Sequence, residues 1–241
     1  MINVYPAESR HSFDLGWLKG SHSFSFGSYF DEKNTAFGPL RVMNDDTIAP
    51  SRGFGAHPHS DMEILSIVLD GALRHEDSLG NVMVTKFGGV QRMSAGTGVV
   101  HTEHNPSDTE DVTLLQLWFE PERRGLAPSY ETTNYDPNSL PGRLLPIASN
   151  DSVEHSVTKL HQDMTVYLSK LTAGSTVTFK QQPGRKVFVF VIEGRLEVTG
   201  TNDASSLLSR RDSARIENET VLKLEGVQEA DETFFMLIDL P

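Results

Sequence analysis

The chain has 241 residues, which is enough for one large domain or for two domains of about 100–120 residues each. Its 37% hydrophobic and 22% charged residues are typical of a soluble globular protein, and the absence of cysteine excludes disulfides, thiolate metal sites and a cysteine nucleophile. The formal net charge of −12 argues against direct binding to nucleic acid, because such proteins normally present a basic face to the phosphates.

The N-terminal segment, Met1 to Pro6, lacks a basic region followed by an apolar core, so we expect no signal peptide. No apolar run along the chain approaches the roughly 20 residues that span a bilayer. We therefore expect a cytoplasmic protein without a membrane partner, and the absence of cysteine fits that compartment.

Short runs rich in β-branched or aromatic residues dominate the sequence, and turn signals such as Asp70-Gly71 and Glu193-Gly194 separate them. The predicted strands are residues 62–69, 112–119, 165–171, 175–179, 186–192, 195–199 and 233–240. No segment shows the long, capped 3.6-residue period of an amphipathic helix. Short strands at this spacing indicate an all-β sandwich or barrel.

Residues 121–150 differ from the rest because they hold five prolines and few aliphatic residues. We interpret this region as an inter-domain connection with little regular structure. Two β units are therefore predicted, with domains at residues 1–125 and 146–241 and a linker at residues 126–145. A weak internal echo supports this, because Ile-Val-Leu-Asp-Gly-Ala-Leu at 67–73 resembles Phe-Val-Ile-Glu-Gly-Arg-Leu at 190–196.

Two histidine motifs carry the chemistry. His57 and His59 alternate on a segment that Pro58 keeps out of a helix, so both imidazoles point to one face. His101 and, two residues later, Glu103 can meet them from a neighbouring strand. Three imidazoles and one carboxylate suit one divalent transition metal ion, such as iron, manganese, copper, nickel, cobalt or zinc. The alternative is a hydrogen-bonded polar cluster at a barrel mouth.

Other titratable residues are open to several interpretations. Glu63 is a fifth ligand, an acceptor that orients an imidazole, or a solvated charge on the strand rim. His104 alternates to the face opposite Glu103, so we expect a structural role. The remaining histidines have no partner at ligand spacing and are expected to be exposed or structural: His11, His22, His75, His155 and His161. The second half has no histidine at the corresponding place, residues 182–188, so no second metal site is expected.

The pattern Gly55-x-His57-x-His59-x3-Glu63, followed by Gly96-x-Gly98-x2-His101-x3-Asn105, resembles the two motifs of the cupin superfamily. A closer resemblance is to the pirin family, and within it to the bacterial pirin-like quercetin 2,3-dioxygenases. It is carried by residues 24–30, 37–45, 57–59 and 98–104 and extends more loosely over the second half. The chain departs from the family at Ser60-Asp61-Met62, where many relatives have Arg-Gly-Phe, and this changes the rim beside the metal.

The resemblance implies a bicupin, with two antiparallel β-barrel (jelly-roll) domains packed face to face and a metal in the N-terminal barrel only. It implies that His57, His59, His101 and Glu103 are the ligands, with the carboxylate taken from the Glu103 position rather than from Glu63. It also implies a flavonol such as quercetin as substrate, molecular oxygen as co-substrate and release of carbon monoxide. Other members of the family act as redox-responsive regulators that bind transcription partners.

Under the enzyme hypothesis, a substrate hydroxyl loses its proton near the cation. Glu103, once it loosens from the metal, is the candidate general base, which requires a raised pKa. One competing hypothesis is a metal-binding, redox-responsive protein that binds a transcription or metabolic partner. Another is a metal-dependent isomerase, or a cupin dioxygenase for a different small aromatic. An enzyme needs an open channel to the metal that admits a planar substrate, and a binding protein does not.

Overall fold

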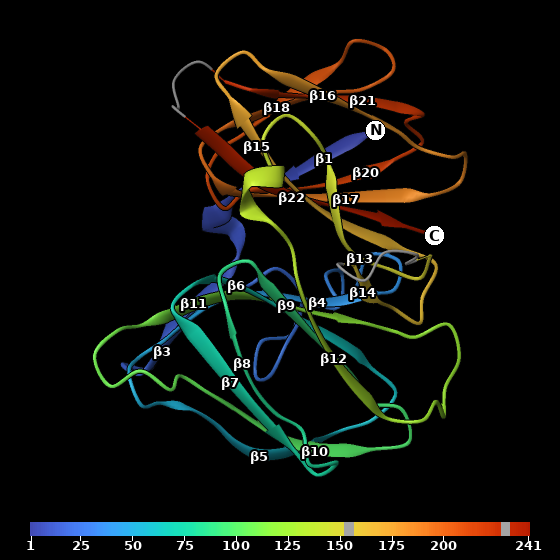
Figure 1. Cartoon of the computed structure of the whole chain (residues 1–241). Coiled ribbons are helices and arrows are strands. Elements are labelled where there is room, and N and C mark those ends of the chain that lie inside the picture. Colours follow the sequence, from blue (N-terminus) through green and yellow to red (C-terminus); the bar gives the residue numbers. More distant parts are fainter. Residues whose placement is uncertain (152–156, 228–231) are drawn as a thin grey trace. The chain divides into compact units, whose positions relative to one another are not determined.

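The computed structural model of the chain describes residues 1–151, 157–227 and 232–241 (Figure 1). Strands account for almost all of its regular structure. Within the described ranges the only helical segments are two short 3-10 turns, η1 (Ala7–Ser9) and η2 (Pro137–Ser139). No helix in this part of the chain has the length and apolar character needed to cross a bilayer. The prediction of an all-β protein is confirmed.

The chain divides into two compact units. The N-terminal unit comprises His11–Tyr135 and the described residues 157–162. The C-terminal unit comprises Met1–Arg10, Asp136–Asp151 and the described residues of Asp163–Pro241. The first ten residues thus belong with the end of the chain, because the first strand pairs with a strand some 210 residues later, with Ile2 opposite Ile216. This pairing was not expected from the sequence, and the limits proposed above for the two domains stay a prediction.

Two antiparallel sheets form the N-terminal unit. The larger sheet contains, in spatial order, β12 (Ser129–Asn134), β9 (Gly89–Ser94), β6 (Glu63–Asp70), β11 (Val112–Phe119), β4 (Leu40–Ile48), β3 (Leu18–His22) and β2 (His11–Asp14). The smaller sheet contains β5 (Gly53–His59), β10 (Val99–His104), β7 (Ala72–Asp77) and β8 (Val82–Lys86). The two-residue strand β14 (Thr158–Lys159) also lies in this unit.

The C-terminal unit repeats this two-sheet plan. Its larger sheet contains, in order, β1 (Ile2–Tyr5), β20 (Ser213–Glu217), β17 (Lys186–Glu193), β22 (Glu232–Leu240), β15 (Thr165–Thr172) and β13 (Leu145–Ser149). Its smaller sheet contains β16 (Thr176–Lys180), β21 (Val221–Gly226), β18 (Leu196–Thr199) and β19 (Ser205–Leu208). The expectation of two antiparallel β-barrel domains is therefore confirmed.

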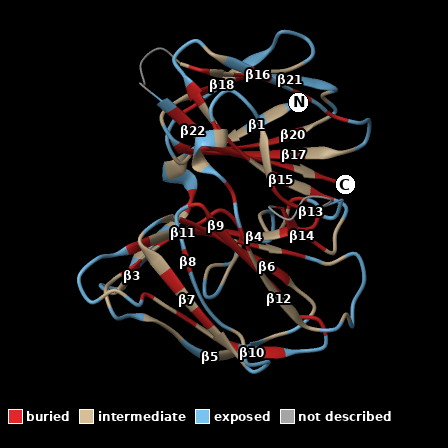
Figure 2. Cartoon of the chain, viewed as in Figure 1, coloured by how far each residue is buried: buried red, intermediate tan, exposed pale blue. Residues whose placement is uncertain are grey.

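Burial explains which sequences became central strands. In both units the buried residues lie mainly on the strands, and the connecting loops are mostly exposed (Figure 2). β6 and β17 are buried along nearly their whole length, so aliphatic or aromatic residues dominate both strands. β11 instead alternates between buried and half-buried positions. Each unit thus encloses its own hydrophobic core.

The internal echo in the sequence corresponds to an equivalent place in the two units. β6 lies between β9 and β11, and β17 lies between β20 and β22. Each strand ends at a glycine, Gly71 or Gly194, with φ of 74° and 81°. This left-handed conformation is one that glycine adopts without strain, so both turns have the same local requirement.

One expectation about the connection between the domains is wrong. Residues 121–150 contain β12, η2 and β13 rather than little regular structure. β12 pairs with β9 at the edge of the larger sheet, from Ser129 opposite Ser94 to Asn134 opposite Gly89. An edge strand needs little apolar surface, and five of the six residues of β12 are only half-buried or exposed. A strand with so polar a sequence was therefore not predicted.

Candidate metal centre

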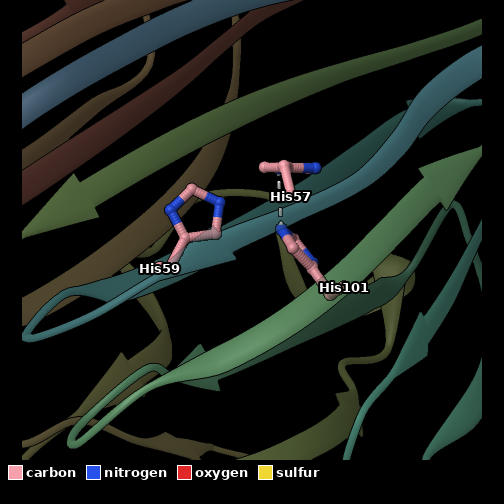
Figure 3. A group of neighbouring side chains, drawn as sticks. All are labelled: His57, His59 and His101. Atoms are coloured by element: carbon pink, nitrogen blue, oxygen red, sulfur yellow. Dashed lines mark hydrogen bonds between the residues drawn. The ribbon is translucent and has the colours of Figure 1, made fainter.

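The two histidine motifs lie on neighbouring antiparallel strands, β5 and β10 (Figure 3). His57 is directly opposite His101 in the strand register, and His59 is opposite Val99. Because side chains alternate along a strand, His57 and His59 leave β5 on one face and Pro58 leaves it on the other. The three imidazoles therefore meet across a single strand pair.

The three rings are close enough to hold one ion. Ring centroids are 4.4 Å apart for His57 and His101, 4.8 Å for His57 and His59, and 4.9 Å for His59 and His101. One nitrogen from each ring lies within 4.8 Å of the other two. The Nε2 atoms of His57 and His101 are 3.1 Å apart. Two nitrogens bound at about 2.1 Å to a common ion, with a right angle between the bonds, are separated by about 3 Å.

The protonation states also fit a metal. Burial lowers the pKa of His59 to about 4 and that of His101 to about 3, and the neighbouring histidines act in the same direction. Both rings are therefore neutral near pH 7, which is the form that binds metals. The Nδ1 of His57 donates to the Gly55 carbonyl oxygen at 2.7 Å, which leaves its Nε2 to face the centre. The residues present fit a divalent transition ion.

Glu103 lies further along β10 from His101, beyond a β-bulge. The bulge places Glu103 opposite Phe54 in the register rather than opposite a histidine of β5. Its side chain is buried, and a carboxylate oxygen lies within 4.8 Å of a nitrogen of both His101 and His75. Burial raises the pKa of this carboxyl, whereas His75 and several hydrogen bonds act to lower it. Glu103 and His101 thus form a cluster of potential ligands with His75, whereas His57 and His59 form a separate cluster with His101.

Two glutamines hold the Glu103 carboxylate. Oε1 accepts from the Gln91 amide at 2.8 Å, and Oε2 accepts from the Gln116 amide at 2.7 Å. Other donors fix the orientation of each amide. The Tyr130 hydroxyl donates to Gln91 Oε1 at 3.1 Å, and Trp118 Nε1 donates to Gln116 Oε1 at 3.1 Å. Both glutamines must therefore present their NH₂ groups to Glu103, which favours its ionised form.

Glu63 serves a different part of the unit. Its side chain is 1% exposed, so the interpretation as a solvated charge on the rim is wrong. Its Oε1 accepts from Ser94 Oγ at 2.5 Å, and its Oε2 accepts from the backbone N–H of His161 at 3.3 Å. Within the described residues it belongs to neither cluster of potential metal ligands. The carboxylate instead fastens the segment 157–162 to β6 and β9.

The remaining histidines have various positions. His104 is half-buried on β10 and alternates with buried His101 and Glu103, as expected. His11 stacks on Tyr29 with ring centroids 4.5 Å apart. His22 is buried, and His155 lies outside the described residues. His75 was expected to be exposed or structural, yet it lies against His101. The alternation Leu73-His75-Asp77 in β7 was the available signal, but no strand was predicted there.

A cavity of about 640 Å³ lies in the N-terminal unit, and three of the four candidate ligands are in its wall. This volume is within the usual range for small-molecule sites. Five aromatic side chains contribute to the wall: Phe13, Trp17, Phe26, Phe54 and Trp118. The wall also contains His57, His59, Glu103 and Gln116. Donor atoms for a metal and an aromatic surface therefore share one cavity.

Comparison with known proteins relates both halves of the chain to one group. The family model described as Pirin matches residues 5–119, and the model described as Quercetinase C-terminal cupin domain matches residues 146–240. A pirin-like protein of Caulobacter vibrioides is 39% identical over 231 residues, which cover 96% of this chain and 97% of the relative. The quercetin 2,3-dioxygenase of Escherichia coli K12 is 37% identical over 241 residues, which cover 100% of this chain and 99% of the relative.

A solved structure shows the same similarity. The bacterial pirin YhhW of Escherichia coli in complex with nickel(II) superposes with a TM-score of 0.90 at 36% sequence identity. The match covers 100% of this chain and 99% of that chain.

Proposed function

Because the chain belongs to the pirin family, we propose that it is a metal-dependent dioxygenase that cleaves a flavonol such as quercetin with molecular oxygen and releases carbon monoxide. A full-length relative named quercetin 2,3-dioxygenase supports this activity. One observation carries the proposal: three of the four candidate ligands, His57, His59 and Glu103, line an aromatic cavity of about 640 Å³, which suits a planar aromatic substrate.

One divalent ion per chain is assigned to His57, His59, His101 and Glu103. This donor set accepts iron, manganese, copper, nickel, cobalt or zinc, so the residues do not select the ion by themselves. The nickel complex of the Escherichia coli pirin makes nickel the first ion to test. When bound, the cation stabilises the deprotonated form of a substrate hydroxyl.

Glu103 is the candidate general base for that hydroxyl. Glu103 lines the cavity, and in the metal-free protein burial raises the pKa of its carboxyl, which is the direction that a general base near neutral pH requires. Gln91 and Gln116 hold the two oxygens, so the carboxylate keeps its position as the proton moves. The raised pKa of Glu103 supports this proposed role.

The aromatic wall orients the substrate and excludes water. Trp118 meets His59 with ring centroids 4.7 Å apart and Phe26 with centroids 5.2 Å apart, in both cases nearly perpendicular. Such edge contacts hold the rings in fixed positions next to the candidate ligands. A flat substrate that enters the cavity therefore meets a preformed apolar surface on the way to the donor atoms.

The same cavity favours an enzyme over a metal-switched binding protein, since a regulator needs no channel to its ion. Reconstitution tests this choice. Metal-free protein is loaded anaerobically with each divalent ion, and oxygen uptake is then followed with quercetin. We expect uptake that depends on the ion and is lost in the His57→Ala/His101→Ala variant. Stoichiometric metal binding without uptake for any ion would instead support the regulator, and partner capture would follow.

A further inference from the structure

The side of the His101 ring that faces away from His57 meets a second buried histidine. His101 Nδ1 lies 3.3 Å from His75 Nδ1, and His75 Nε2 lies 3.0 Å from Asp77 Oδ2. The side chains of His75 and Asp77 are 1% and 0% exposed. Both come from β7, which pairs with β10 on the side opposite β5, with Glu103 opposite His75 and His101 opposite Asp77. Three strands therefore contribute side chains to one connected series, His57, His101, His75 and Asp77.

The hydrogen positions in this series of side chains can be assigned by starting from Asp77. Asp77 Oδ1 accepts from the backbone N–H groups of Leu79 at 2.9 Å and Asn81 at 3.0 Å, and from the Asn81 amide at 3.1 Å. Oδ2 accepts from the same amide at 2.8 Å. A carboxylate surrounded by donors acts as an acceptor, so His75 must carry its proton on Nε2 to donate to Oδ2.

With its hydrogen on Nε2, His75 presents the lone pair of Nδ1 to His101, so the His101 ring must supply the hydrogen between the two rings. His101 is thereby protonated on Nδ1 and bare on Nε2. That bare nitrogen is the atom that lies 3.1 Å from His57 Nε2, in the three-histidine group. The buried carboxylate of Asp77 thus fixes the hydrogen position on His75, and His75 in turn fixes it on His101, which leaves the metal-facing nitrogen of His101 without a hydrogen.

The orientation of His75 is fixed by contacts that also reach Glu103. Its ring stacks on Tyr130, with centroids 4.1 Å apart and planes inclined by 14°. The Tyr130 hydroxyl donates to Gln91, whose amide in turn donates to Glu103 Oε1. A single network therefore sets the positions of His101 and Glu103.

We propose that Asp77 and His75 are positioning residues that fix His101 in the tautomer with a bare Nε2, ready to bind the metal. This inference rests on the ligand set given under Proposed function, but not on the identity of the substrate or on dioxygenase activity. An imidazole ligand commonly donates its other N–H to an acceptor that fixes its tautomer. Here a second imidazole is interposed between that ligand and the carboxylate.

The variant Asp77→Asn isolates the effect. Three donors point at the Oδ1 position, so the amide oxygen is expected there and the NH₂ group at the position that faces His75. His75 Nε2 must then accept, which moves its proton to Nδ1 and directs it at His101. His101 in turn must carry its proton on Nε2, the nitrogen meant for the metal. The same logic applies wherever a carboxylate that orients a histidine is replaced by its amide.

The test reads the tautomers and the metal affinity separately. Long-range ¹H–¹⁵N spectra of the metal-free, histidine-labelled protein are expected to show His101 protonated on Nδ1 and His75 on Nε2, and the reverse in Asp77→Asn. Nickel affinity, measured by competition with a chelator, is expected to fall about 10–100-fold in Asp77→Asn. The matched control is Glu76→Gln, which removes one charge from the same strand at a side chain that is 42% exposed and paired with Arg74. It is expected to change neither measurement.

Two results would overturn the proposal. The first is a wild-type spectrum with His101 protonated on Nε2, which needs no variant and holds even if Asp77→Asn does not fold. The second is a folded Asp77→Asn protein that binds nickel no more weakly than Glu76→Gln. Absence of quercetin turnover would count against the proposed function and would leave both measurements intact, so the two failures are distinguishable.

Discussion

Gly53 lies where the start of β5 touches β10, and its lack of a side chain allows the two strands to approach. Gly53 is opposite His104 in the register, next to the pair Phe54 and Glu103. A Cβ at this position would lie 2.3 Å from the Glu103 carbonyl oxygen and 2.3 Å from the His104 Cα. Contacts of a Cβ with such atoms essentially never fall below 3.0 Å. Gly53→Ala must therefore push the strands apart locally by about 0.7 Å.

This displacement affects the candidate metal centre directly, because β5 carries His57 and His59 and β10 carries His101. Metal–ligand distances tolerate deviations of about 0.2 Å, so a shift of about 0.7 Å cannot be absorbed without distorting the site. We expect nickel affinity to fall by at least about tenfold, an effect similar to the loss of a group that orients a ligand. The free energy of unfolding of the metal-free protein should fall by about 1–3 kcal/mol, as is usual for overpacking.

Gly55→Ala is the matched control on the same strand. A Cβ at Gly55 meets nothing within 4 Å, so neither the strand contact nor the ligand positions should change. Chelator competition measures nickel affinity, and urea unfolding measures stability. If Gly53→Ala and Gly55→Ala have equal affinities and equal stabilities, the contact of β5 with β10 does not set the geometry of the site.

Three further predictions concern the base, the cavity wall and the effect of pH. Glu103→Gln should lower quercetin turnover by at least about 100-fold at full metal occupancy, because an amide cannot accept the proton; unchanged turnover of the loaded variant would exclude the base role. Phe26→Ala should raise the KM for quercetin about 2–10-fold and leave nickel affinity unchanged, whereas Phe26→Leu should retain most of the wall. Steady-state oxygen uptake measures the KM and chelator competition measures the affinity, and an unaltered KM would remove Phe26 from the substrate contact. The metal-free protein should lose stability as the pH falls below about 6.5. In the unfolded chain His59 and His101 bind protons near that pH, whereas in the folded chain their pKa values are lowered to about 4 and about 3. Urea unfolding at several pH values should show a smaller loss for His101→Gln, and an equal loss would contradict this assignment.

The central strands of both units could be predicted from the sequence. The predicted segments 62–69 and 186–192 agree closely with β6 and β17 because strands buried on both faces need continuous apolar runs. Edge strands were harder. β12 has the sequence Ser-Tyr-Glu-Thr-Thr-Asn, and its partner β9 supplies most of the reason for it to be extended. A local pattern does not contain that information.

The three-histidine group could also be anticipated, because strand alternation and Pro58 together determine which way His57 and His59 point. His75 could not, since its contact with His101 depends on β7 pairing with the far side of β10. The partner of Glu63 was hidden for the same reason: His161 is 98 residues away in the sequence. Local periodicity thus indicated the candidate ligands of a metal, while the residues that hold those ligands in place depend on non-local register.

Carbon monoxide measurement on the metal-loaded protein tests the proposed activity most directly. Quercetin and oxygen are supplied to protein reconstituted with the ion that supports the fastest uptake, and the gas released is compared with the oxygen consumed. We expect one molecule of carbon monoxide for each molecule of oxygen, and neither change in the His57→Ala/His101→Ala variant. Oxygen consumption without carbon monoxide, or no consumption by fully loaded protein, would contradict the assignment as a flavonol-cleaving dioxygenase.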